Sequence, residues 1–323
     1  MPCGNAIKKI RHMTDILTLT INPALDVLTS IDKVNDTHKM RCGPTLKQPG
    51  GGGVNVARVL QRLGSNCMAL YLAGGVTGER HHQLMHSEKV RTHVMPIAEE
   101  TRESFSVHET SSGHDFRFVL PGPKVSAAEY EACFDYVEQH LPKKFLVISG
   151  GLAPGVPDNF YARLVALAKA HNVRVVLDAN GPALADALKA GVYLFKPSLR
   201  ELRDLTGQVL RTVDEQVAAA EQLIHNGQAQ MVAVSLGSEG ALVVSATEQW
   251  RARSIQVEVQ TTIGAGDSFV AGMVWALGRG DSLVKAFQYG MASGAAALLE
   301  PGTSLCQAAD IHRLLPQVVV EAL

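Results

Sequence analysis

Residues Gly264, Ala265, Gly266 and Asp267 combine two glycines with a carboxylate, directly before the apolar run 268–278. Glycines at the start of a helix let the backbone approach a ligand and direct free N–H groups toward an anion. A carboxylate beside such a turn can accept the proton of a hydroxyl that attacks a phosphoryl group. The same four residues also fit an acid that only caps a helix after a glycine loop. The sequence alone leaves both interpretations open.

Four successive glycines, Gly50–Gly53, stand directly before Val54 and Asn55, where a helix is expected to begin. Such a run carries a large cost in backbone entropy, which indicates that the backbone approaches a ligand closely. A flexible hinge is the alternative. The tract matches neither the G-x-x-x-x-G-K-[ST] P-loop nor the G-x-G-x-x-G fingerprint, so a Walker-type ATPase and a typical NAD-dependent dehydrogenase are both disfavoured.

Three further segments carry polar groups after predicted strands. Glu201, in the stretch 196–201, could present a carboxylate to Mg²⁺ or serve only as a helix-start acid that complements the dipole. The turn 235–240 could border a nucleotide or only join two strands of a hairpin. Asp26 follows the first predicted strand and is an ordinary turn acid unless a ligand hydroxyl binds to it.

Lys39, Arg41 and Arg102 lie in two segments that alternate like short strands. If the three side chains meet in the folded chain, they would form a phosphate clamp, because ammonium and guanidinium groups bind phosphate oxygens strongly. Solvated surface charge is the simpler interpretation of these residues taken by themselves.

The composition narrows the class of protein. The chain has 323 residues, of which 46% are hydrophobic and 19% charged, enough apolar content for a large core. Its 30 Lys and Arg residues face 31 Asp and Glu residues, so the net charge of −1 indicates neither nucleic acid nor an anionic membrane as a partner. No apolar run reaches the roughly 18 residues of a membrane-spanning helix.

The cysteines and the first residues of the chain indicate a compartment. The five cysteines are odd in number, widely spaced and contain no C-x-x-C pair, which argues against a zinc ribbon or a disulfide scaffold. Residues 1–14 are polar and basic and lack the apolar region of a secretory signal. We therefore expect a cytoplasmic protein in which residues 1–12 form an N-terminal extension.

Strands and helices that alternate along the chain would position these residues. Apolar runs rich in β-branched residues predict strands, and helical periodicity predicts the segments between them. Such alternation implies βαβ units and a mostly parallel sheet covered on both faces. Two polar, alternating segments near 27–48 and 100–120 do not fit this pattern and are expected to form a small separate sheet, a β lid. The expected strands of the main sheet include 15–21, 68–75, 145–151, 173–180, 192–197 and 230–237.

Taken together and in order, these motifs resemble those of the PfkB/ribokinase family of sugar kinases. Both signatures of that family are present, PGGGGVNVARVLQRLG at 49–64 and TTIGAGDSFVAGMV at 261–274. Shorter co-linear matches accompany them, including INPALD at 21–26 and KPSLRE at 196–201. The similarity extends from about residue 13 to the end of the chain.

Within the family, the glycine tract distinguishes substrate types. Tagatose-6-phosphate kinases and 1-phosphofructokinases usually carry lysine where this chain has Gly52. In having glycine at this position, the chain resembles the minor 6-phosphofructokinase type. The segments FRFVLPG (116–122) and GTSLC (302–306) point the same way. The resemblance therefore implies ATP-dependent phosphoryl transfer to the C1 hydroxyl of fructose 6-phosphate. Activity on fructose 1-phosphate or tagatose 6-phosphate is the alternative.

The resemblance also implies an architecture and an assembly. The expected fold is a ribokinase-like three-layer α/β/α core formed by residues 13–26, 50–98 and 121–323, with a β lid formed by 27–49 and 99–120. Lids of this family often mediate dimerisation, so a homodimer is expected. ATP is expected to bind with Mg²⁺, and a monovalent cation such as K⁺ is expected near the anion-binding turn.

The resemblance assigns roles residue by residue. Asp267 would take the proton of the C1 hydroxyl, while the amides of Gly264, Ala265 and Gly266 would hold the charge that develops on the γ-phosphoryl group. The expected ligands of the sugar and its phosphate are Asp26, Gly52, Gly53, Asn55, Lys39, Arg41 and Arg102. The expected nucleotide contacts are Lys196, Ser198, Ser235, Gly237 and Gly240. Glu201 and Asp178 would organise Mg²⁺.

Three positions depart from the family's pattern. Ser198 stands where the N-x-x-E motif usually has asparagine, Gly151 stands where a serine is usual, and Glu300-Pro301 replaces a polar pair near the expected cation loop. The first two motivate an alternative of another class, a sugar-phosphate-binding or nucleotide-binding regulatory protein with weak activity. The intact sequence at 264–267 opposes it, because a dead kinase has no need to keep the base and the anion-binding turn together.

Overall fold

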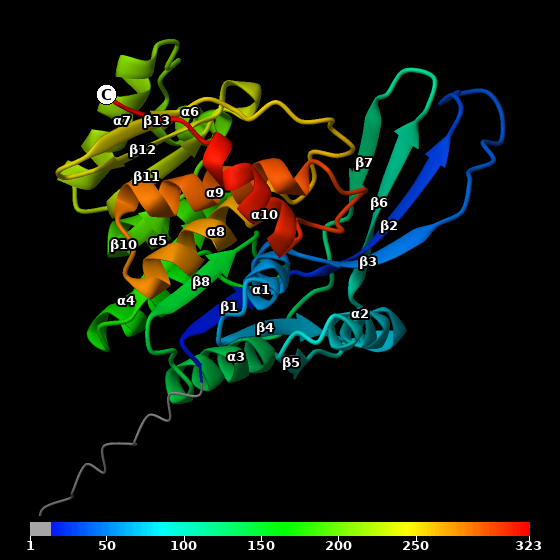
Figure 1. Cartoon of the computed structure of the whole chain (residues 1–323). Coiled ribbons are helices and arrows are strands. Elements are labelled where there is room, and N and C mark those ends of the chain that lie inside the picture. Colours follow the sequence, from blue (N-terminus) through cyan, green and yellow to red (C-terminus); the bar gives the residue numbers. More distant parts are fainter. Residues whose placement is uncertain (1–13) are drawn as a thin grey trace, which may run out of the picture.

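The computed structural model describes residues 14–323, so the predicted N-terminal extension, 1–12, lies outside the described residues. Within them the chain forms a large ten-stranded sheet with helices on both faces, and a four-stranded sheet that projects to one side (Figure 1). The α/β class, the mostly parallel main sheet and the separate small β sheet predicted from the sequence are confirmed.

The large sheet consists of two kinds of strand. Its strands are β1 (Ile16–Thr20), β4 (Cys67–Ala73), β5 (Thr92–Pro96), β8 (Phe145–Ser149), β9 (Arg174–Asp178), β10 (Val192–Phe195), β11 (Ala229–Ser235), β12 (Ala241–Ser245), β13 (Gln249–Ala252) and β14 (Val320–Ala322). In space they follow the order β14-β13-β12-β11-β10-β9-β8-β1-β4-β5. All neighbours from β11 to β5 are parallel, so their carboxyl ends meet at one edge of the sheet. The strands β12, β13 and β14 extend the sheet beyond β11, each antiparallel to the strand before it.

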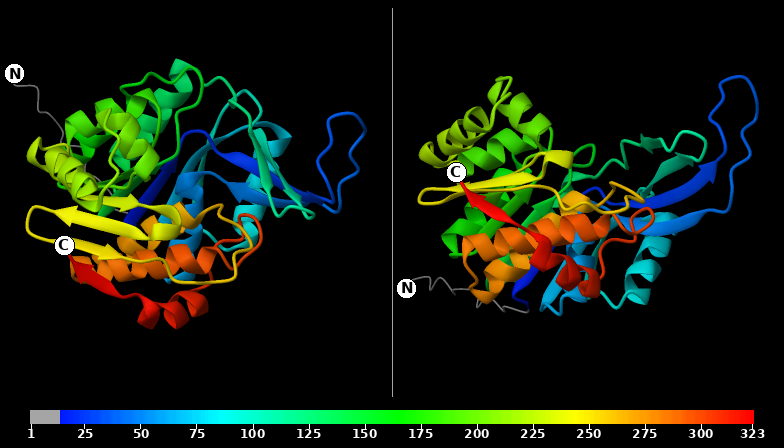
Figure 2. Two further views of the ribbon diagram at one scale, coloured as in Figure 1. Left: turned by 90° about the horizontal axis from the view of Figure 1, so that it is seen from above. Right: turned by 45° about the horizontal axis from the view of Figure 1, so that its top comes forward.

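Helices cover both faces of this sheet (Figure 2). The helices are α1 (Gly52–Arg62), α2 (Gly75–Ser87), α3 (Ala127–Gln139), α4 (Phe160–Ala170), α5 (Pro182–Ala190), α6 (Leu199–Thr206), α7 (Val213–His225), α8 (Ala265–Arg279), α9 (Leu283–Ala297) and α10 (Ala308–Leu314), with short 3₁₀ turns η1 (Gly237–Glu239) and η2 (Leu315–Gln317). Helices α3 to α7 pack in one core cluster, and α1, α8, α9 and α10 pack in another. No helix in the described part of the chain is long and apolar enough to cross a bilayer.

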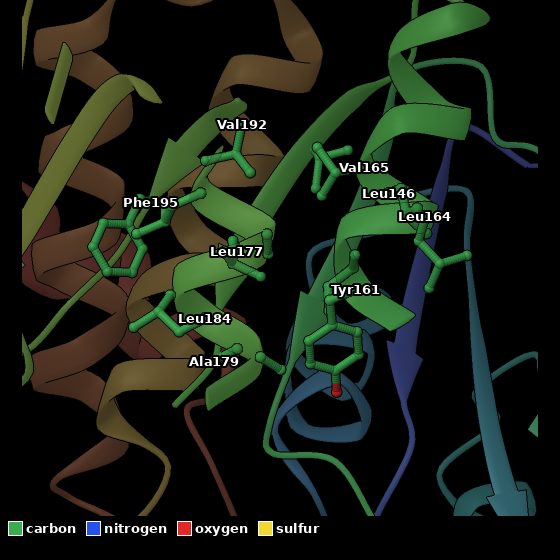
Figure 3. Close-up of a cluster of buried hydrophobic side chains, with 14 of the residues drawn as sticks. Leu146, Tyr161, Leu164, Val165, Leu177, Ala179, Leu184, Val192 and Phe195 are labelled. Atoms are coloured by element: carbon green, nitrogen blue, oxygen red, sulfur yellow. The ribbon is translucent and has the colours of Figure 1, made fainter. Parts of the chain in front are cut away.

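The core explains why the central strands read as apolar runs. Their side chains point alternately to the two helical layers, so both faces of each strand are buried. In one cluster, side chains from three adjacent strands meet side chains of α4 and α5 (Figure 3). Burying each large apolar side chain contributes roughly 1.5–3 kcal/mol relative to exposure. The labelled members of this cluster are Leu146, Tyr161, Leu164, Val165, Leu177, Ala179, Leu184, Val192 and Phe195.

The lid is the four-stranded sheet with the order β3-β2-β6-β7. Its strands are β2 (Ala24–Ile31), β3 (Leu46–Gly50), β6 (Arg102–Glu109) and β7 (Asp115–Val119). Strand β2 is central and pairs antiparallel with β3 and parallel with β6. The sheet extends into residues 24–26 and 50, which the sequence analysis placed in the core, because the ladder between β2 and β3 continues to the pair Ala24 and Gly50.

Candidate active site

A cavity of about 300 Å³ lies between the lid and the carboxyl ends of the central strands. Open α/β sheets bind ligands at this edge, where the strand order reverses, and here β1 lies between β8 and β4. The cavity brings together predicted site residues from six separate segments of the chain. These are Asp26, Gly52, Asn55, Arg102, Asp178, Glu201, Gly264 and Asp267.

The first turn of α8 forms one wall. Gly264 is the N-cap, with φ 76°, and a Cβ there would lie 2.3 Å from the Leu305 side chain, so this position requires glycine. The first four amides of a helix have no acceptor within the helix, and the dipole favours an anion at this end. The turn therefore has the geometry of the predicted anion-binding site, and it includes Ala265, Gly266 and Asp267.

Asp267 is a buried carboxylate with a defined partner. The side-chain amide of Asn55 donates a hydrogen bond to Asp267 Oδ2 at 2.9 Å. Burial raises the pKa of Asp267 to about 7, the negative charge of Asp178 adds to this, and the Asn55 hydrogen bond and the charge of Lys196 act in the opposite direction. A carboxylate with a pKa close to neutrality can both accept and release a proton, as a general base must.

The glycine tract is tightly packed against strand β1. A Cβ on Gly53 would lie 2.6 Å from the backbone oxygen of Leu19, and the Val54 amide donates to Thr20 Oγ1 at 2.9 Å. These contacts oppose the alternative that the tract is a flexible hinge. They fix the start of α1, so that Gly52 lines the cavity, Gly53 is buried beneath it and Asn55 points toward the first turn of α8.

Lys196 lies below the cavity floor. Its ammonium pairs with Asp178 at 3.2 Å, and a Cβ on Gly266 would be 3.6 Å from it, so the cation lies between the end of β9 and the start of α8. Although burial opposes its charge, the pKa of Lys196 is raised because Asp178, Glu201 and Asp267 surround it. Burial raises the pKa of Asp178, and the Lys196 charge opposes that shift. Lys196 is thus a buried counter-ion of the acidic residues.

The remaining predicted nucleotide residues lie along the same edge of the sheet but do not line the cavity. Ser198 and Glu201 form a reciprocal capping box at the start of α6, with the Ser198 amide donating to Glu201 Oε2 at 2.7 Å. Ser198 also forms an isolated bridge with Ser235, beside the turn that contains Gly237 and Gly240. Serine at position 198 therefore supports the helix start, and Glu201 still reaches the cavity.

Four charged residues of the lid behave differently from one another. Lys39 and Arg41 are exposed in the loop between β2 and β3 and do not line the cavity, so the structure does not bring them to Arg102. Arg102 lines the cavity but donates to the backbone oxygens of Asn22 and Leu120, at 2.9 and 2.6 Å. Burial raises the pKa of Asp26 to about 6, opposed chiefly by the charge of Arg117.

Arg117 is a cavity residue that the sequence analysis missed, as are Ser104, Ser149 and Asn180. Arg117 and Val119 alternate on β7 and both face the cavity, while β7 pairs with β6 across from β2. The alternation of the segment 116–120 was visible in the sequence, but its pairing with a distant strand was not.

Comparison with known proteins is consistent with this site. The model of the pfkB family carbohydrate kinases matches residues 22–310. The chain is 45% identical over 299 residues to the ATP-dependent 6-phosphofructokinase isozyme 2 of Mycobacterium tuberculosis, covering 92% of this chain and 88% of that protein. It is 36% identical over 303 residues to the protein of the same name from Escherichia coli, covering 94% and 98% of the two chains.

Solved structures agree with the sequence relatives. The structure of phosphofructokinase-2 from Escherichia coli with fructose-6-phosphate superposes with a TM-score of 0.89 at 35% identity and covers 95% of this chain and 99% of that chain. The same protein has been solved with potassium (TM-score 0.90, 36% identity, 94% and 99% covered) and as a tetrameric inhibited form (TM-score 0.89, 35% identity, 94% and 99% covered).

Proposed function

Because the chain belongs to the pfkB family of carbohydrate kinases, we propose that it transfers the γ-phosphoryl group of ATP to the C1 hydroxyl of fructose 6-phosphate. The products are fructose 1,6-bisphosphate and ADP. The family and the ATP-dependent phosphosugar kinase activity predicted from the sequence are confirmed by these relatives. The cavity carries the proposal, because Asp267 from the core and the guanidinium groups of Arg102 and Arg117 from the lid line the same space.

In the proposed mechanism, Asp267 is the general base. The sugar hydroxyl donates its proton to the carboxylate as its oxygen forms a bond to the γ-phosphorus, and the bond from phosphorus to the bridging oxygen of ADP breaks. Asn55 holds the carboxylate by its 2.9 Å hydrogen bond. Asp26, also in the cavity, is proposed to bind a sugar hydroxyl together with Asn55 and the backbone at Gly52 and Gly53.

The first turn of α8 is proposed to bind the negative charge that develops on the transferred phosphoryl group. The amides of Gly264, Ala265 and Gly266 are proposed to donate to the phosphoryl oxygens, where the helix dipole adds to the effect. We propose that the adenine nucleotide continues along the sheet edge over Ser198, Ser235, Gly237 and Gly240, with Lys196 buried beneath the phosphates.

Mg²⁺ fits the acidic side of the cavity. Asp178, Glu201 and Asp267 face the same space, and their mutual repulsion contributes to raising the pKa values of Asp178 and Asp267, so a cation there would relieve it. In residues 14–323, no group of three or more side chains is arranged as a metal cage. Mg²⁺ would therefore be held by one or two carboxylates and the nucleotide phosphates, and it would neutralise phosphate charge.

We also propose a monovalent cation such as K⁺ near the anion-binding turn, since the similar Escherichia coli protein has been solved with potassium. The cytoplasm is the proposed compartment. The described cysteines, Cys42, Cys67, Cys133 and Cys306, are all free thiols, which fits a reducing environment.

A homodimer through the lid is the proposed assembly. Phe105 and Phe118 are cross-strand partners on β6 and β7, 39% and 56% exposed, and alternation places them on the side of the sheet away from Asp26 and Arg117. An exposed aromatic pair on a projecting sheet is a liability that a second copy would cover. The tetrameric form known for the Escherichia coli protein shows that a relative assembles further.

The test of the substrate is ADP release with Mg-ATP and a panel of fructose 6-phosphate, fructose 1-phosphate, tagatose 6-phosphate and fructose. We expect strong preference for fructose 6-phosphate. The Asp267→Asn protein, purified in the same way, controls for contaminating kinases. Preference for another phosphosugar keeps the mechanism and replaces the substrate. Nucleotide binding without ADP release for any sugar would favour the regulatory alternative that Ser198 and Gly151 motivated.

A further inference from the structure

Arg58, on α1, is a buried cation that takes no part in the steps above. The residue is 1% exposed and does not line the cavity. Burying a guanidinium group costs free energy unless its N–H groups are bonded and its charge is compensated. Its partners therefore show what this residue holds in place.

Those partners come from four parts of the chain. Nη1 donates to the backbone oxygens of Pro49, at the end of the lid strand β3, and Thr303, at 3.1 and 2.8 Å. Nε and Nη2 both donate to Glu88 Oε1, at 2.9 and 2.6 Å, which compensates the charge. Nη1 also donates to Asn55 Oδ1 at 3.2 Å, so its two N–H groups serve three acceptors and one N–H is shared. Arg58 thus joins the lid, the C-terminal loop and α2 to the residue that contacts the base.

The bond to Asn55 sets the direction of its side-chain amide. A primary amide has one accepting oxygen and one donating nitrogen. With the oxygen bonded to Arg58, the nitrogen is left to donate to Asp267 at 2.9 Å. The reversed amide would place its N–H groups against the guanidinium donors and its oxygen against the carboxylate, so both contacts would be lost.

We propose that Arg58 is a positioning residue for phosphoryl transfer, which acts through Asn55 to hold the Asp267 carboxylate in the orientation that accepts the proton. The inference rests on the proposed function, in which Asp267 is the base. Because Arg58 acts on that base through Asn55, its loss lowers kcat. Asn55 is also a proposed contact of the sugar, so the KM for the phosphosugar rises as well, whereas the KM for ATP is unchanged.

Arg62, one turn further along α1, is a matched control. It also bonds Glu88, at 2.7 Å, and it donates to the backbone oxygens of Ser304, Leu305 and Cys306 in the same C-terminal loop. It makes no bond to Asn55. The two arginines therefore share their acidic partner and a structural task, and only Arg58 is linked to the base.

The experiment is a pair of double-mutant cycles, Arg58→Lys with Asn55→Ala and Arg62→Lys with Asn55→Ala. The phosphosugar used is the one with the highest rate in the substrate panel. Lysine keeps the charge beside Glu88 but lacks the planar fork that reaches Asn55 as well. We expect Arg58→Lys to lower kcat about tenfold in the wild-type background and to have little further effect when Asn55 is alanine.

For the control, we expect the effect of Arg62→Lys on kcat to be small and equal in both backgrounds. Equal fold-losses from Arg58→Lys with and without Asn55 would overturn the proposal, since a merely structural arginine acts independently of its neighbour's side chain. A wild-type chain that phosphorylates no sugar in the panel overturns the proposed function itself, and this result is read before any variant is made.

Should Arg58→Lys fail to fold, Glu88→Gln serves in its place. It leaves the Arg58 side chain intact and removes the charge that holds it, at a partly exposed site on the far side of the guanidinium. The expected loss in kcat is smaller, about threefold, and again disappears in the Asn55→Ala background. The same loss in both backgrounds would overturn the proposal.

Discussion

The floor of the cavity and the lid above it are built on opposite principles. On the floor, Asn55 donates a hydrogen bond to Asp267, and Asp178 forms an ion pair with Lys196 directly below it. In the lid, Lys39 and Arg41 are exposed on a loop away from the cavity. The floor lies in a buried, low-dielectric setting that orients groups in advance, whereas the loop between β2 and β3 leaves its charged groups in water.

This contrast assigns phosphoryl transfer to the cavity floor and substrate binding to the lid. The groups proposed to act on the reacting atoms need no rearrangement, which is the condition for strong electrostatic catalysis. The lid residues Arg102 and Arg117 line the cavity opposite these groups and are proposed to bind the substrate's phosphate. We therefore expect floor variants to change kcat and lid variants to change KM or assembly.

The largest effect should come from Asp267→Asn. Asparagine still accepts the hydrogen bond of Asn55 but cannot take a proton, so kcat should fall by about 10²–10⁴. Binding of ATP, measured by calorimetry, should be retained. Asp204→Asn, at an exposed position on α6, is the matched control and should be as active as wild type. Turnover by the Asp267→Asn protein at the wild-type rate would remove Asp267 from its role.

The next effect concerns Arg117, the lid cation that reaches the cavity. Arg117→Gln should raise KM for the phosphosugar about tenfold to a hundredfold, as expected for a hydrogen bond to a charged group, with little change in kcat. Arg80→Gln, an exposed arginine outside the cavity, should change neither. An equal rise in KM from Lys39→Gln would contradict the distinction between Arg117 and the exposed loop, since the loop would then have to reach the substrate.

The pH dependence of kcat/KM should report the protonation state of Asp267 on the cavity floor. Because burial raises the pKa of Asp267 to about 7, the base is protonated and inactive below that pH, and kcat/KM should fall about tenfold per pH unit below it. The Asp26→Asn protein should keep this break but move it to a slightly lower pH, because the Asp26 charge is one of the smaller contributions that raise the pKa of Asp267. A profile that is flat between about pH 5.5 and 8 would contradict the assignment.

The free energy of unfolding should also depend on the protonation of Asp267, but it should rise where activity falls. A carboxyl group whose pKa is raised on folding favours the folded state when protonated, and this contribution is lost as the pH rises through about 7. Asp267→Asn should therefore have a higher free energy of unfolding than wild type at pH 8 in urea titrations. The difference should vanish near pH 4, where both side chains are neutral.

The smallest kinetic effect should come from the outer side of the lid. Phe118→Asp places a charge in the exposed aromatic pair and should convert the proposed dimer to monomer in sedimentation velocity. Val209→Asp alters an equally exposed apolar residue between α6 and α7 and should leave the assembly unchanged. A Phe118→Asp protein that sediments as wild type would place the interface elsewhere.

The difference between the cavity floor and the lid also explains which features the sequence could predict. Asp267 and Asn55 sit in short motifs where local spacing dictates the helix start, so their elements could be predicted, and the structure joins them by one hydrogen bond. The main parallel strands were also visible as apolar runs. These features depend on neighbours within a few residues, or on burial on both faces.

What was missed depends on pairing between distant segments. Arg117 reaches the cavity only because β6 lies parallel to β2 and β7 returns beside it, which no local pattern reveals. Strands β13 and β14 have four and three residues and pair antiparallel at the edge of the sheet, too short for alternation to be recognised. The position of Lys39 and Arg41 depends on a loop without regular structure.

One arrangement at the base of the lid has a thermodynamic consequence. Arg102 donates to Asn22 just before β2 and to Leu120 just after β7, so its side chain ties together the two ends of the lid. These tethers, with a longer bond to Pro23, occupy three of the five N–H groups of the guanidinium, so two remain for a phosphate. The folded chain itself holds the side chain in place, so the loss of its rotamer entropy belongs to folding rather than to binding. Substrate affinity would thus gain from the hydrogen bonds that tie the two ends of the lid together.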